Sequence, residues 1–235
     1  MGEKKRFAFL WNPTFRLIAT WVWWAVGAGI TLWMIANASG IDFKDFRTIY
    51  SQSPHLLIYV EIVGVGLFPL LLTIICRDDL TLYGIRRDRL FASLFWSALV
   101  VVANSIYLFL ATGNWLNWRA LTVHLDFPLN LWYAALGFFV YGPLEVFFVI
   151  WLIVNAEQAI RGQFLTVSWG LIVTVMLVGL AHIATSSNLT SAIYVTVIFF
   201  LFGLISGRTK NSLGPMIAWT LINGQVWFLV QFLWS

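Results

Sequence analysis

The chain has 235 residues, of which 60% are hydrophobic and 10% are charged. Soluble domains carry about 25% charged residues, so this composition excludes an ordinary water-soluble fold and predicts an integral membrane protein. The 14 Lys and Arg residues outnumber the 10 Asp and Glu residues, but they are dispersed along the chain, which argues against a nucleic-acid partner. The single cysteine, Cys76, excludes an internal disulfide and a cysteine-based zinc motif.

Apolar segments of membrane-spanning length follow one another along the chain. After a basic N-terminal stretch they occur at about residues 17–37, 55–76, 91–112, 131–154, 166–186, 191–207 and 212–234. They are too long and continuous for barrel strands, and open β-structure cannot cross lipid, so we expect helices. The sequence therefore predicts an all-α polytopic transmembrane bundle of about seven spans, or eight if a charged interfacial helix at 78–90 is counted. No linker divides it, so we expect one integral membrane domain over 1–235.

The basic residues predict how these spans are oriented. With the N-terminus inside, the outer segments hold Lys44, Arg47 and Arg119, and the inner segments hold all the other Lys and Arg residues. Cytoplasmic loops carry the excess of Lys and Arg in membrane proteins. We therefore expect a cytoplasmic N-terminus and a C-terminus on the outer side.

Two glycines four residues apart stand near the end of the sixth segment, Gly203 and Gly207. This spacing lets two helix backbones approach closely. We expect helix packing at both positions.

Polar side chains occur inside the apolar segments at Glu61, Glu145, His182 and Asn223. An ionised carboxylate in the middle of a bilayer costs about 3 kcal/mol on insertion scales, so each Glu needs a partner, a proton or a metal ion. Taken one at a time, such residues are most often hydrogen-bonded groups that hold helices together.

Taken together, Glu145, His182 and Asn223 come from three different segments and could surround one divalent ion. A catalytic zinc site uses three protein ligands and a water molecule, whose pKa the metal lowers to about 7. That arrangement would permit peptide-bond hydrolysis in the membrane. At about 1.5 Å per residue, however, the expected segment boundaries place Glu145 and His182 about 13 Å apart in depth.

Four stretches in order resemble the CPBP family of intramembrane metalloproteases, which includes the CAAX prenyl endopeptidases. Residues 82–87 are similar to the family's Leu-Gly-Leu-Arg segment, and residues 142–145 to the approach to its Glu-Glu-x-x-x-Arg motif. Residues 179–182 are similar to its Phe-x-x-x-His motif, and residues 203–223 to the last stretch, where a basic turn and a Pro precede His-x-x-x-Asn. The resemblance covers about residues 80–225.

The chain also departs from the family's motifs. Val146 stands at the second Glu of the first motif, and Val149 or Ile150 stands near its Arg. Trp219 stands at the His of the last motif, and an indole has an N–H donor and no lone pair for a metal. What remains of the family's site is Glu145, His182 and Asn223.

The resemblance implies two functions, and composition allows a third. In a diverged intramembrane metalloprotease, Glu145 would activate water while His182 and Asn223 bind or orient Zn²⁺. The substrate would be a membrane-associated protein or a lipidated peptide. In a non-catalytic member of the fold, the chain would act as a membrane scaffold or binding protein. In a small transporter subunit, Glu61 and Glu145 would be proton or cation sites, but the sequence shows no inverted repeat of the kind that marks transporters.

Overall fold

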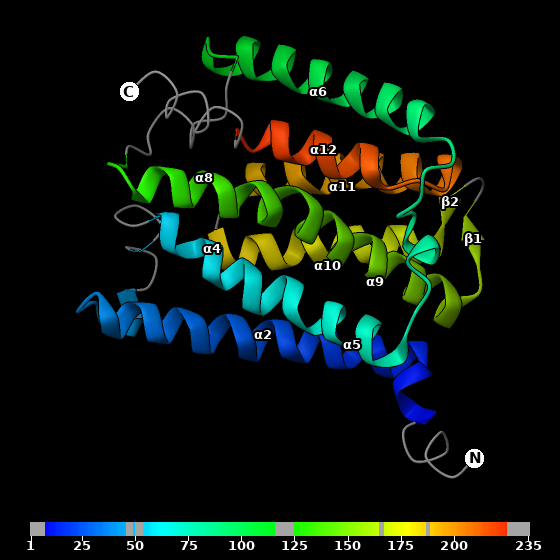
Figure 1. Ribbon diagram of the computed structural model, residues 1–235, viewed down its shortest axis with the longest axis horizontal. Coiled ribbons are helices and arrows are strands. Elements are labelled where there is room, and N and C mark those ends of the chain that lie inside the picture. Colours follow the sequence, from blue (N-terminus) through cyan, green and yellow to red (C-terminus); the bar gives the residue numbers. More distant parts are fainter. Residues whose placement is uncertain are drawn as a thin grey trace.

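The computed structural model describes residues 8–45, 49, 54–115, 125–164, 167–186 and 189–224. Of these residues, 84% are helical, which confirms the prediction of an all-α fold. The main helices lie side by side, with their long axes along one common direction (Figure 1). The described residues also include a short antiparallel hairpin, in which β1, Gln163–Phe164, pairs with β2, Val167–Ser168.

Seven rods of helix make up the described bundle. In chain order they are α2 (Pro13–Ala38), α4–η4–α5 (Leu57–Val60, Glu61–Leu67, Phe68–Cys76), α6 (Leu90–Thr112), α8–η6–α9 (Leu129–Phe139, Val140–Leu144, Glu145–Ile160), α10 (Trp169–Ser186), α11 (Leu189–Thr209) and α12 (Leu213–Ile222). Two of the rods are composite, because each contains a π-helical segment, η4 or η6, between two α-helices.

Five of these rods are long and apolar enough to cross a membrane, and they end at Ala38, Cys76, Thr112, Ile160 and Thr209. The helices Trp169–Thr185 and Leu213–Ile222 are apolar but shorter. The chain is therefore a multi-pass membrane protein by helix length and composition, while the count of seven spans stays a prediction. Residues 225–234 of the predicted last span lie outside the described part of the chain, as do Arg47 and Arg119.

The charged segment after α5 is not the interfacial helix considered at 78–90. It forms one 3-10 turn, η5 (Leu80–Tyr83), and then an irregular loop. Gly84 has φ +74° and Arg89 has φ +53°, and these left-handed conformations interrupt a right-handed helix on both sides of the loop. The segment is thus a connector that ends where α6 begins.

Helix α9 lies at the centre of the bundle. Every residue from 146 to 153 is buried, so the helix has no lipid-facing side along this length. It packs against α2, α10, α11 and α12, and a helix that is apolar all round is expected in such a central position. Glu145, its first residue, is half-buried and directly precedes this buried length.

Helix α6 lies at the edge of the bundle, against α12 and α11 (Figure 1). Its buried residues form one narrow stripe, Ser93, Ser97, Val100 and Asn104. From this stripe Asn104 Oδ1 accepts a hydrogen bond of 2.6 Å from Tyr194 Oη of α11. The remaining surface of α6 is apolar and exposed, as a helix in contact with lipid should be.

Two loops are tied together at the end of the bundle where α5, α9 and α11 finish, which we call the basic end. Asn211 Nδ2 donates to the carbonyl oxygens of Arg86 (2.6 Å) and Asp88 (2.9 Å), and Ser212 Oγ donates to the Tyr83 carbonyl (2.6 Å). We call residues 83–89 and 208–212 the clasp. Because it fixes the start of α12 against the start of α6, it sets the position from which α12 returns into the bundle.

Candidate functional site

Glu145 and Asn223 lie in one polar centre in the middle of the bundle. The indole Nε1–H of Trp219 donates a hydrogen bond to Glu145 Oε2. Asn223 Nδ2 donates to the carbonyl oxygens of Trp219 (3.2 Å) and Tyr141 (3.3 Å). The structure therefore brings Glu145 and Asn223 together, and Trp219 links them. We call Tyr141, Glu145, Trp219 and Asn223 the Glu145 centre.

A π-helical segment shapes the main chain on one side of this centre. η6 runs from Val140 to Leu144 and contains Pro143. Proline has no N–H and its ring clashes with the carbonyl four residues earlier, so a regular α-helical ladder cannot continue through it. The Tyr141 carbonyl within this segment is the one that accepts from Asn223. π-Helical turns of this kind occur frequently at functional sites.

Gly142 allows α12 to approach η6 closely. A Cβ atom at this position would lie 1.7 Å from Thr220 Oγ1 and 2.7 Å from the Met216 carbonyl oxygen. No side chain larger than hydrogen fits there, so the first residue of the Gly-Pro-Leu-Glu stretch serves a packing need. The approach it permits is what brings Trp219, one turn of α12 from Met216, within reach of Glu145.

The second π-helix, η4, packs against the first. A Cβ atom at Gly66 would lie 2.2 Å from the side chain of Leu144, the residue before Glu145. η4 begins at Glu61, so both glutamates within the predicted spans adjoin a π-helical segment. Glu61 is the first residue of η4, and Gly66 lies five residues after it.

The Trp219 indole is fixed on its other sides by aromatic residues of α11. Its ring centroid lies 4.9 Å from that of Phe199 and 6.2 Å from that of Phe202, and its side chain is 5% exposed. An indole held in this way presents its only polar group, the N–H, to Glu145. The position predicted to have lost a metal ligand has therefore gained a donor for the remaining carboxylate.

His182 lies on the neighbouring helix at about the same level as Glu145. α10 runs antiparallel to α9 after the hairpin, and a Cβ atom at Gly170 would lie 2.5 Å from the Glu157 nitrogen, which fixes their register. Glu145 lies twelve residues before Glu157, and His182 lies twelve residues after Gly170, about 18 Å in each case. The difference in depth of about 13 Å that the sequence predicts between Glu145 and His182 is therefore wrong. The predicted boundaries ended α9 six residues too early and began α10 three residues too early.

His182 also follows the buried face of α10. Leu171, Val175 and Val178 are buried in the main core cluster at spacings of four and three residues, and His182 comes four residues later and is half-buried. Residues at this spacing share one helix face. The structure thus places His182 on the side of α10 that packs into the bundle.

The residues of the Glu145 centre do not fit a catalytic zinc ion. Across the described ranges, no group of three or more His, Cys, Asp or Glu residues is placed so that it could hold a metal ion. Trp219 directs an N–H, not a lone pair, at the Glu145 carboxylate. Val146, at the place of the family's second Glu, is completely buried among apolar side chains.

A second polar cluster, which the sequence did not reveal, lies near the basic end. Arg16 forms a bidentate ion pair with Asp78, with N–O distances of 2.8 and 3.0 Å, and the two side chains are each 7% exposed. Tyr83 Oη donates to Asp78 at 2.5 Å, and the Arg16 guanidinium lies 5.9 Å from the Trp151 ring centroid. Burial, followed by the hydrogen bond to Asp78, raises the pKa of Tyr83 above its ordinary value. An Arg at the start of an apolar segment was the one available signal, but nothing in the sequence points to Asp78 as its partner.

Comparison of the sequence and fold with protein-family models, curated proteins and solved structures gives no match.

Proposed function

We propose that the chain is a diverged CPBP-like integral membrane protein that binds a membrane-associated protein or lipidated peptide without hydrolysing it. The observation that carries this proposal is the hydrogen bond from the Trp219 indole to Glu145. A glutamate that acts as a general base must hold a water molecule beside the metal that activates it. Here the carboxylate is held by a donor that cannot leave without repacking two phenylalanine contacts.

The relation to the CPBP family is supported by the way the four similar stretches meet. Residues 82–87 and 211–212 are joined in the clasp, and residues 142–145 lie against residues 216–223 of the last stretch. Residues 179–182 lie on α10, which packs along α9. A site shared by stretches distant in sequence is what the family resemblance predicts, and the lost ligand positions fit a member whose site has become structural.

Lipid forms the rest of the environment, since the rods that end at Ala38, Cys76, Thr112, Ile160 and Thr209 expose apolar side chains. The loops and helix ends at the basic end carry several exposed cations, among them Arg77, Arg87, Arg161 and Arg208. By the positive-inside rule we place the basic end, with the described start of the chain, on the cytoplasmic side. The end of α12 then faces the outer side.

Metal-dependent proteolysis is the second candidate, and the common level of Glu145 and His182 favours it. A metal there would need a further ligand, for which the Glu145 centre offers the Asn223 side chain. The two functions predict different behaviour of one substrate, so a single assay separates them.

The assay uses the full chain in nanodiscs with added zinc and a prenylated peptide that carries a fluorophore and a quencher. Binding raises the anisotropy, and cleavage raises the intensity. We expect binding without cleavage, both in the unmodified chain and in Glu145→Gln. Cleavage that Glu145→Gln abolishes would overturn the proposal, and unchanged anisotropy would remove lipidated peptides as the partner class.

A further inference from the structure

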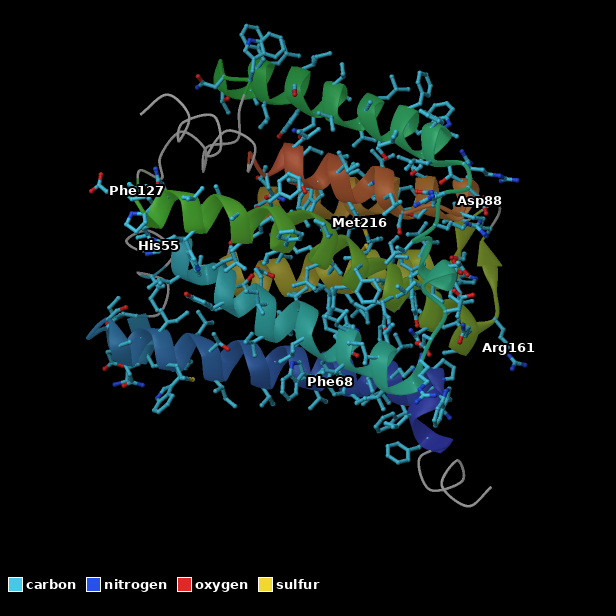
Figure 2. The ribbon with its side chains drawn as sticks, viewed as in Figure 1. His55, Phe68, Asp88, Phe127, Arg161 and Met216 are labelled. Carbon is cyan, nitrogen blue, oxygen red and sulfur yellow. The ribbon has the colours of Figure 1, made fainter. Side chains whose placement is uncertain are left out.

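The clasp gathers cations from two loops that are far apart in the sequence. Arg86 Nε donates to the Lys210 carbonyl oxygen at 2.6 Å, and Arg89 Nη1 donates to the Arg208 carbonyl oxygen at 3.3 Å. These bonds bring four basic residues to one place beside the start of α6. The labelled Asp88 marks this place in Figure 2, at the same end of the bundle as Arg161 and opposite His55.

The charge of this cluster is not neutralised. The guanidinium groups of Arg86 and Arg89 donate to main-chain carbonyl oxygens, which carry no net charge. The ion pairs between Arg16 and Asp78 and between Lys44 and Asp42 do not involve these four cations. Asp88, which is exposed, is the one acidic residue in 86–89 and 208–210. A net positive surface therefore remains after the loops have been joined.

Two of the cations occupy backbone positions that suit glycine. Arg89 has φ +53° and Lys210 has φ +54°, in the left-handed region that glycine enters without a steric cost. Lys210 directly follows α11, at the position where helices most often end in glycine. Arg77 and Arg161, outside the clasp, also have positive φ, so cations at such positions are a feature of the whole basic end and not of the clasp alone.

Apolar side chains continue from the cluster along α6. Phe91, two residues after Arg89, is 87% exposed, and Phe95, one turn further on, is 60% exposed. α6 and α11 are both candidate membrane spans, so the cluster lies where the spans begin and end, at the level of lipid headgroups. Cations next to an exposed apolar helix face match a lipid headgroup joined to its acyl chains better than a nucleic acid, which has no apolar tail.

We infer that the clasp is a binding site for an anionic phospholipid. The phosphate and any further negative charge of the headgroup contact Arg86, Arg89, Arg208 and Lys210, and the acyl chains lie along the exposed face of α6. This site is separate from the Glu145 centre and goes beyond the function proposed for it.

The test measures lipid retention by the full chain, purified from nanodiscs of phosphatidylcholine mixed with phosphatidylglycerol, by native mass spectrometry. The test variants are Arg208→Gln and Lys210→Gly, because within the described residues only the main-chain carbonyls of these two positions take part in the clasp. Glycine also suits the backbone at 210, so loss of binding there cannot be attributed to a strained fold. Matched controls are Arg161→Gln, an exposed cation at the same end outside the clasp, and Lys44→Gln, an exposed cation outside the basic end.

We expect phosphatidylglycerol to be retained in preference to phosphatidylcholine. Each clasp variant should weaken retention about fivefold, since each cation near an anionic headgroup contributes on the order of 1 kcal/mol. The two controls should retain the lipid as the unmodified chain does. Equal retention of both lipids by the unmodified chain would overturn the inference. So would an equal loss in Arg161→Gln, because the binding would then follow overall charge rather than the clasp.

Discussion

The substitution Gly142→Ala tests the close approach on which the Glu145 centre depends. The added Cβ would lie 1.7 Å from Thr220 Oγ1 and 2.7 Å from the Met216 carbonyl oxygen, and the second of these atoms belongs to the main chain and cannot rotate away. Overpacking in a core costs about 1–3 kcal/mol, and two simultaneous overlaps place this change at about 3 kcal/mol. Thermal unfolding in detergent, followed by circular dichroism, should show a clear decrease in the midpoint temperature.

Gly207→Ala is the matched control, because a Cβ there meets nothing within 4 Å and the residue lies in α11. Alanine in a helix is more stable than glycine by about 0.5–1 kcal/mol, so this variant should unfold at the same temperature or higher. The double variant Gly142→Ala/Thr220→Ala removes the closer overlap and should recover part of the loss. If Gly142→Ala and Gly207→Ala unfold at the same midpoint temperature, the packing of α12 against η6 described above is wrong.

Three further predictions concern the two polar clusters. Trp219→Phe removes the donor to Glu145 and should lower the stability by about 1–3 kcal/mol, whereas in a Glu145→Gln background the same change should cost less, as measured by thermal unfolding. Arg16→Met leaves the Asp78 carboxylate buried without its cation and should lower the free energy of unfolding by about 3–5 kcal/mol. The double variant Arg16→Met/Asp78→Leu removes both charges and should lower it much less. Equal losses of stability in the two variants would show that the ion pair is not buried. The pKa of Tyr83 is raised in the folded state, so the unfolded chain loses this proton at a lower pH than the folded chain does. The midpoint temperature should therefore fall as the pH rises above about 10. In Tyr83→Phe it should fall less steeply.

The apolar segments predict most of the helices because membrane-spanning length and continuity are local properties of the sequence. The second, third and sixth predicted segments coincide with observed rods to within two residues at each end. The fourth segment is longer than expected, because α9 continues through the charged residue Glu157 to Ile160. The segment 78–90 has the composition of an interfacial helix, but two left-handed residues prevent it.

The glycine pair at the end of α11 shows the limit of a spacing rule. A Cβ at Gly203 would lie 2.3 Å from the Leu171 side chain, as the prediction of close packing requires. A Cβ at Gly207 would meet nothing within 4 Å, and Leu171, which lies opposite Gly203, is already the third residue of α10. Spacing specifies one face of a helix, and only the neighbouring helix decides how far along that face the contact extends.

The candidate site was also only partly predictable, because the sequence shows which residue needs a partner but not which residue supplies it. A carboxylate in an apolar segment must find a partner, so Glu145 could be selected from the sequence alone. The partner of Glu145 could not be identified from the sequence. Trp219 stands where the similar motif has a histidine, and its N–H meets Glu145 only because α12 packs against η6. The register of α10 against α9, which brings His182 level with Glu145, depends on where the hairpin ends and not on any property of the two residues.

The most direct test of the central claim is the zinc content of the chain purified in detergent without a chelator. We expect no stoichiometric zinc in the unmodified chain, even after zinc is added. In Trp219→His, where an imidazole replaces the indole beside Glu145, we expect zinc binding that Glu145→Gln abolishes. Stoichiometric zinc in the unmodified chain, lost in both Glu145→Gln and His182→Ala, would contradict the account and establish a metal centre.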